Sequence, residues 1–218
     1  MTDLNAAAVL EITLRTLAVC GTALVISLAL GLPIGILLGR QRFRGRAPVV
    51  SIVNAGMGAP PVVIGLLVSL MLWRNGPLSF LDLLYTREAM VIAQVLIALP
   101  LVIGITLAAA GALDEDWELQ VRTLGVPPLL RFWLLVREIR LGLLAAVIAA
   151  LGGILSEVGA VQAVGANLDG ETRVLTTAIL MNTQMGLFET ALALAAVLLG
   201  MTLVLAGLLT AVQQGGRR

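Results

Sequence analysis

Histidine and lysine are absent from this chain of 218 residues, and Cys20 is its only cysteine. Zinc sites, disulfide bonds and cysteine–histidine nucleophile pairs therefore lack their usual side chains. A nucleotide-binding loop of the GxxxxGK[ST] type needs a lysine to reach the phosphates, so this chain cannot carry one. If nucleotide hydrolysis drives the protein, another subunit must perform it. We expect no metal site, no cofactor and no catalytic residue in this chain.

Charged residues are also scarce. They make up 12% of the chain and hydrophobic residues make up 59%, against roughly 25% and 45–50% in soluble domains. Several uncharged stretches exceed the ~20 residues that cross a bilayer as a helix. We predict an all-α membrane protein with a single domain over residues 1–218 and about five transmembrane helices. The predicted spans cover residues 12–39, 48–73, 88–111, 139–162 and 189–213.

Arginine is concentrated on one side of this five-span arrangement. Residues 40–46, 122–140 and 217–218 hold four, four and two of the fourteen basic residues. Since cytoplasmic loops collect arginine, we predict the N-terminus outside and the C-terminus inside a bacterial or archaeal cytoplasmic membrane. The arginines are dispersed and form no stripe of the kind that binds nucleic acid. Membrane lipid, and not nucleic acid, is therefore an expected partner.

Small residues and prolines mark two of the predicted spans. Gly31, Gly35 and Gly39 repeat every four residues, a spacing that lets two helix backbones approach closely. Packing within the chain is the favoured interpretation, and a contact between subunits is the alternative. Pro60 and Pro61 each remove a backbone donor in the second span. They predict a bent helix that borders a cavity.

A charged, proline-broken segment lies between the third and fourth spans. Acidic residues 114–116 stand where the first turn of a helix favours negative charge, and Glu118 and Arg122 have the spacing of a helical ion pair. Gly125 suits the left-handed residue that closes a helix. The pattern predicts a short amphipathic helix, a glycine turn and a second short helix from about Pro128. One face of the first helix should carry Trp117, Val121 and Leu124.

This segment has two physical interpretations. It could lie on the membrane surface as an interfacial hairpin anchored by Trp117 and Trp133, or it could bind a cytoplasmic partner. A resemblance favours the second. Glu118, followed seven residues later by Gly125, resembles the cytoplasmic loop of binding-protein-dependent ABC importer permeases. The family form is Glu-Ala-Ala, three residues, Gly, nine residues, then Ile-x-Leu-Pro. Here Leu119 and Gln120 replace the alanines, and residues 136–138 depart from the ending.

The resemblance implies a type I ABC importer permease with residues 112–138 as its cytoplasmic coupling loop. The expected complex contains a homodimer of the permease, two copies of an ABC ATPase that bind ATP and magnesium, and an extracytoplasmic oxyanion-binding protein. An amphipathic helix seated in a groove of the ATPase is a reasonable coupling device. The residues expected to contact the ATPase or to shape the loop are Glu118, Val121, Arg122, Leu124 and Gly125.

Residues 54–94 and 156–195 are similar to the permeases of tungstate importers within that family. The resemblance implies import of tungstate; molybdate and sulfate permeases share the architecture and are the alternatives. An oxyanion needs hydrogen-bond donors along its route, although hydroxyls and amides in membrane helices usually bond to neighbouring backbone. The candidates for the pathway or its gate are Asn54, Pro60, Pro61, Ser156, Glu157, Arg173, Thr176 and Thr177.

Glu157 interrupts an apolar run, and a carboxylate within the membrane usually marks a cavity or a partner. Its charge disfavours direct contact with an anion, so we expect a role in gate closure or an ion pair with Arg173. Gly152 and Gly153 would allow close approach across a dimer axis. A stand-alone secondary transporter or channel is the main competing class, although the inverted repeats that carriers commonly show are not evident. A membrane enzyme would find little catalytic material here.

Overall fold

The structure of the protein is a computed structural model in which residues 6–215 are described, without the side chains of Glu115, Glu118, Val212 and Gln214. Within this part every regular element is a helix. The helices are α1 (Ala6–Arg40), α2 (Arg46–Met57), α3 (Pro61–Leu72), the short 3-10 helix η1 (Ser79–Leu81), α4 (Arg87–Gly111), α5 (Glu115–Thr123), α6 (Pro128–Glu138), α7 (Arg140–Ser156), α8 (Gly159–Gly165), α9 (Leu175–Gln184) and α10 (Phe188–Gly215).

Three helices are long and apolar enough to cross a membrane by themselves, namely α1, α4 and α10. The pairs α2–α3 and α6–α7 are bent by 103° and 63°, and each pair passes the same length and composition test if it is counted as one span. The described residues therefore hold three to five candidate spans, which agrees with the predicted number of about five.

The predicted spans at residues 48–73 and 139–162 are not continuous helices. The first divides into α2 and α3, because Pro60 adopts an extended conformation and Pro61 occupies the first position of α3, where a missing backbone donor costs nothing. The second ends at Ser156, where the extended backbone of Glu157 separates α7 from α8. Both breaks lie at residues that the sequence analysis named as pathway or gate candidates.

The glycines of α1 pack directly on α4. A β-carbon added at Gly31 would lie 2.7 Å from a methyl carbon of Val102, and one added at Gly35 would lie 2.8 Å from the carbonyl oxygen of Ile103. At Gly39 it would lie 2.7 Å from the β-carbon of Ala110. The favoured interpretation of this glycine repeat, packing within the chain, is confirmed.

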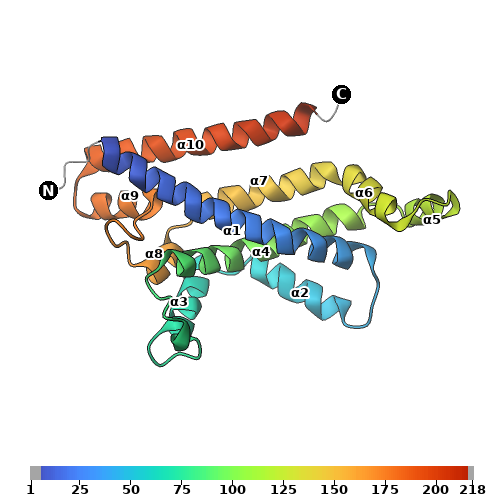
Figure 1. Cartoon of the computed structure of the whole chain (residues 1–218), viewed down its shortest axis with the longest axis horizontal. Coiled ribbons are helices and arrows are strands. Elements are labelled where there is room, and N and C mark those ends of the chain that lie inside the picture. The colour runs from blue at the N-terminus through green and yellow to red at the C-terminus, as the bar shows by residue number, and fades with distance from the viewer. Residues whose placement is uncertain (1–5, 216–218) are drawn as a thin grey trace.

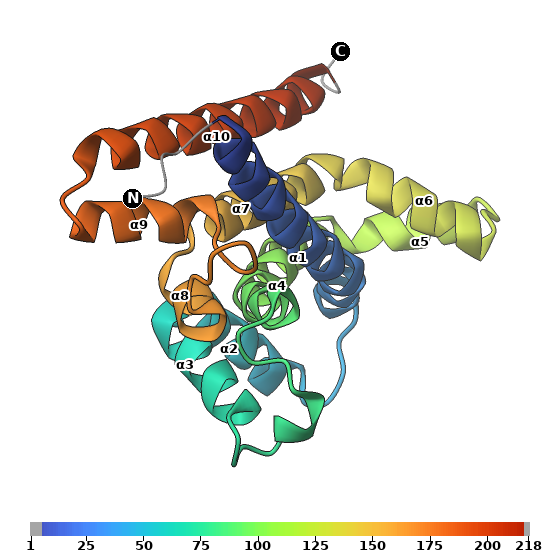
Figure 2. The same ribbon diagram turned by 60° about the vertical axis from the view of Figure 1, so that its left-hand side comes forward.

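Two of the arginine-rich segments, residues 40–46 and 122–140, lie at one end of the molecule. Figure 1 places the loop after α1, the α5–α6 turn and the end of α10 on the right, while α8 and α9 lie on the left near the start of α1. Figure 2 shows α10 along one flank, with α5 and α6 projecting from the bundle. The core joins these parts: buried Ala23 of α1, Val102 of α4 and Ile154 of α7 belong to one apolar cluster.

The α1–α4 contact generates a first prediction. We expect Gly35→Leu to reduce the free energy of unfolding by about 1–3 kcal/mol, because the larger side chain overlaps the backbone of α4. Gly21→Leu in the same helix is the matched control, since a β-carbon there meets nothing within 4 Å. Thermal unfolding of the purified variants in one mild detergent measures the difference. Equal melting temperatures for the two variants would contradict this contact.

Candidate functional site

The predicted turn between α5 and α6 is present. Asp114 precedes α5 and its side chain accepts a hydrogen bond from the backbone N–H of Asp116 at 3.2 Å. The N–H of Gly125 donates to the carbonyl of Arg122 at 3.0 Å, and Gly125 has a φ of +69°. This left-handed conformation is costly for residues with a β-carbon. The predicted helix, glycine turn and second helix beginning at Pro128 are confirmed.

The expected apolar face of α5 divides into an inner and an outer part. Trp117 packs against the apolar cluster that contains Ile36 and Leu135, and Val121 is buried. Leu124, by contrast, is 79% exposed at the turn. The prediction of one shared face is therefore wrong at Leu124. Trp117 is partly buried against this cluster, so its indole is less available as a membrane anchor than a fully exposed one would be.

The outer part forms an apolar surface at the tip of the α5–α6 turn, which we call the tip surface. Its residues are Leu119, Leu124, Leu129, Leu130, Phe132 and Trp133. Gly125 lies among them with no atom within 4 Å of the position of an added β-carbon. Exposed apolar side chains on a charged segment that is expected outside the membrane favour an interaction site, so the tip surface is the candidate for partner binding. Arg122 is exposed beside it, and the side chain of Glu118 lies outside the described residues.

A second candidate site lies at the junction of α7 and α8. The side chain of Glu157 is buried and accepts a hydrogen bond from the backbone N–H of Ala160 at 2.8 Å. The Thr176 hydroxyl of α9 donates to the backbone carbonyl of Glu157 at 3.1 Å. Val62, one residue into α3, packs against Gly159. The junction thus brings together Glu157, Thr176 and the beginning of α3 at Pro61, next to the exposed Ser156.

Four other predicted residues take different positions. Arg173 forms an ion pair with Asp169 at 2.8 Å, so the expected pair with Glu157 is not formed. The Thr177 hydroxyl donates to the carbonyl of Val174 at 3.1 Å and accepts from its N–H, which closes the first turn of α9. Asn54 is exposed on α2, separate from these contacts. Pro60 is exposed at the break between α2 and α3.

Arg15 is a structural residue that was not predicted from the sequence. Its side chain is buried in α1 and donates to the backbone carbonyls of Arg173 at 2.9 Å and Gly170 at 2.8 Å. It also forms an ion pair with Glu11. Arg15 therefore fastens the loop before α9 to α1. An arginine four residues after a glutamate, at the start of an apolar run, was the available signal.

Comparison with known proteins decides the class. Residues 31–218 match the family described as binding-protein-dependent transport system inner membrane component. The chain belongs to this family. It is a permease subunit of an ABC importer and a multi-pass protein of the inner membrane, and the family implies an ATPase and a substrate-binding protein as partners.

Two relatives cover most of this permease. It is 40% identical to a probable anion ABC transporter permease of Haloferax volcanii, over 92% of this chain and 89% of the relative. It is 37% identical to the tungstate uptake permease TupB of Peptoclostridium acidaminophilum, over 90% of this chain and 86% of the relative. More distant relatives include a sulfate permease of Synechocystis at 30% identity and a molybdenum permease of Haemophilus influenzae at 26%.

The fold of the permease is that of a type I ABC importer. It matches a chain of the MetNI methionine ABC transporter, recorded in inward-facing conformations, with a TM-score of 0.74 over 100% of both chains. At 16% sequence identity this likeness describes the fold alone. The predicted all-α fold of a type I importer permease is confirmed, and the predicted orientation in the membrane stays a prediction.

The junction of α7 and α8 generates a second prediction. We expect Glu157→Leu to reduce the free energy of unfolding by about 1–3 kcal/mol, because it leaves the buried N–H of Ala160 without an acceptor. Glu157→Gln keeps a side-chain oxygen at the same position and should change stability much less. Thermal unfolding in detergent compares the two. Equal destabilisation by both variants would show that the negative charge, and not the hydrogen bond, stabilises the junction.

Proposed function

We propose that this permease imports tungstate into the cytoplasm and that a separate subunit hydrolyses the ATP that drives it. The observation that carries the substrate is the 37% identity to a tungstate uptake permease over 90% of the chain. The lack of lysine supports the second part, because a phosphate-binding loop requires one. Sulfate and molybdate are the alternative substrates, since permeases for sulfate and molybdenum are also relatives.

The tip surface is the proposed contact with the ATPase. Leu124 and Leu129 are 79% and 82% exposed. A groove of the ATPase that covered them would remove apolar surface from water and so stabilise the complex. Trp117 and Val121 hold the opposite face of α5 against the bundle. A force applied at Leu124 would therefore be transmitted through α5 and α6 to α7. Two ATPases that close on ATP and magnesium would act in this way on two copies of the permease.

The proposed pathway lies between two copies, beside the α7–α8 junction. Gly152 of α7 is exposed and nothing lies within 4 Å of an added β-carbon, which leaves room for a second copy. Ser156 is exposed one turn later. The carboxylate of Glu157 is turned toward the N–H of Ala160, so its charge is partly compensated away from the anion. Binding along this route is weak, and the extracytoplasmic binding protein selects the substrate.

The coupling role generates a third prediction. We expect Gly125→Asp to leave the protein inserted but to reduce ATP-driven uptake at least tenfold, because a side chain at φ +69° distorts the tip surface. Gly45→Asp is the matched control: Gly45 is also left-handed, with φ +94°, and also has open space around it. It lies in the loop after α1, away from the tip. Equal uptake by the two variants would contradict the docking role.

The substrate generates a fourth prediction. In proteoliposomes that contain the permease, its ATPase and its binding protein, we expect tungstate at low concentration to stimulate ATP hydrolysis and to accumulate inside. Sulfate or molybdate stimulation without a response to tungstate would overturn the substrate while leaving the importer intact. Uptake that needs no ATP would instead favour a stand-alone transporter or channel.

A further inference from the structure

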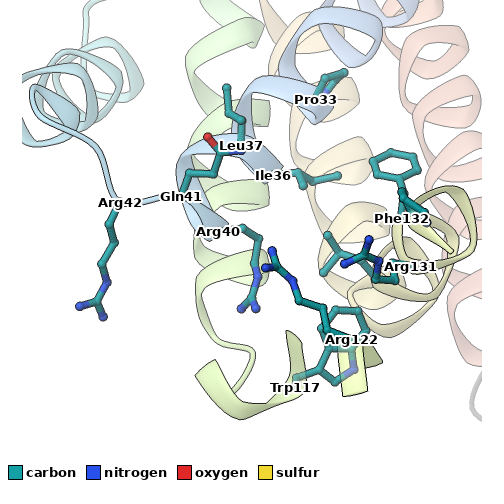
Figure 3. Close-up of a pocket in the computed structure, with 12 residues that line it drawn as sticks. Pro33, Ile36, Leu37, Arg40, Gln41, Arg42, Trp117, Arg122, Arg131 and Phe132 are labelled. Atoms are coloured by element: carbon teal, nitrogen blue, oxygen red, sulfur yellow. The ribbon is translucent and has the colours of Figure 1, made fainter. Parts of the chain in front are cut away.

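A cavity of about 750 Å³ lies between the end of α1 and the α5–α6 turn. Figure 3 shows Arg40 of α1, Arg122 of α5 and Arg131 of α6 extending into this space, and Arg42 lines it from the loop after α1. None of the described residues that line the cavity is acidic. Three elements that are far apart in sequence thus bring positive charge to one place.

Most of the remaining lining is apolar, with Gln41 and Arg42 as the polar exceptions. Pro33, Ile36 and Leu37 line it from α1, and Phe132 and Leu135 line it from α6. Pro33 precedes Arg40 by seven residues of continuous helix, which is about 10 Å at 1.5 Å per residue. The cavity therefore combines a basic mouth at the end of α1 with an apolar wall that leads toward the middle of the bundle.

Two of the arginines have features that suit the binding of an anion. The Nε atom of Arg131 is buried and has no hydrogen-bond partner, whereas buried donors in proteins are nearly always satisfied. Arg40 is held in place, since it donates to the carbonyl of Leu113 at 3.3 Å and its guanidinium lies 5.9 Å from the centre of the Trp117 ring. A guanidinium fixed in this way presents paired donors that match the oxygens of a phosphate.

We propose that this cavity binds an anionic phospholipid of the cytoplasmic leaflet, with the headgroup phosphate between Arg40, Arg122 and Arg131 and an acyl chain along the wall. The leaflet rests on the predicted orientation, in which the end of α1 is cytoplasmic. The cytoplasmic leaflet carries negative lipids, and basic pockets between helices on that side bind their headgroups. A free oxyanion shares the phosphate chemistry but would leave the apolar wall of Leu37 and Phe132 in water.

The test uses the full-length chain, purified in detergent with whichever subunits copurify. Native mass spectrometry titrates phosphatidylglycerol, or phosphatidylcholine with the same acyl chains, into this preparation. We expect one phosphatidylglycerol per chain with at least tenfold tighter binding than phosphatidylcholine. Arg131→Gln should weaken phosphatidylglycerol binding about fivefold, and the double variant with Arg40→Gln about twenty-five-fold. Arg44→Gln, an exposed arginine outside the cavity, is the matched control and should change it less than twofold.

Two further measurements keep the proposal testable if an arginine variant fails to fold. Leu37→Ser should weaken lipid binding because it makes the apolar wall polar. Arg131→Lys keeps the charge but loses the paired donors, so it should weaken binding less than Arg131→Gln does. Equal binding of the two lipids by the unaltered chain would overturn the proposal. So would displacement of phosphatidylglycerol by micromolar tungstate or glycerol phosphate, which would assign the cavity to a soluble anion. Lipid binding measured in detergent depends neither on the orientation of the chain in a membrane nor on transport. A negative result would therefore overturn the lipid site and leave the proposed function untouched.

Discussion

The close contact between α1 and α4 fixes the positions of both candidate sites. Gly35 places the backbone of α1 directly against the carbonyl of Ile103, and a β-carbon there would overlap it. From this contact α1 extends in two directions. At one end Ile36 supports the base of the α5–α6 turn, and at the other end Arg15 holds the loop before α9. One long helix therefore connects the end of the permease that carries the proposed ATPase contact with its opposite end.

The candidate pathway residues of this permease lie at breaks between its helices. Backbone groups freed at a break need partners, which a membrane interior does not supply. At the α7–α8 junction the carboxylate of Glu157 accepts the N–H of Ala160, and the hydroxyl of Thr176 donates to the carbonyl of Glu157. These bonds make an irregular backbone stable beside the proposed pathway. They also explain how a buried acid is compatible with the passage of an anion.

Composition and spacing were sufficient for the overall class and for the shape of the turn. The scarcity of charge predicted a membrane bundle, and Gly125 predicted the left-handed residue that the structure contains. Side-chain partners were less accessible to prediction. The pairing of Arg173 with Asp169, instead of Glu157, depends on the loop before α9, whose path no local pattern specifies. Likewise, Leu124 leaves the face of Trp117 because the helix ends at Thr123.

The angles between the helices of the two bent spans could not be predicted from the sequence either. Two adjacent prolines indicated a kink, but the 103° angle between α2 and α3 depends on how α3 packs beside α8. Similarly, no proline lies at Glu157 from which its extended backbone could be predicted. Its backbone carbonyl accepts a hydrogen bond from Thr176 of α9. This contact joins residues that are distant in the sequence, so no local pattern predicts it.

Contact between the tip surface and an ATPase is the central claim, and photo-crosslinking in the membrane tests it most directly. A photoreactive amino acid at Leu124 should yield a covalent product with a second polypeptide that hydrolyses ATP. The same amino acid at Phe80, which is 76% exposed within η1, should yield no such product. Crosslinks from position 124 only to lipid or to another copy of this chain would contradict the account.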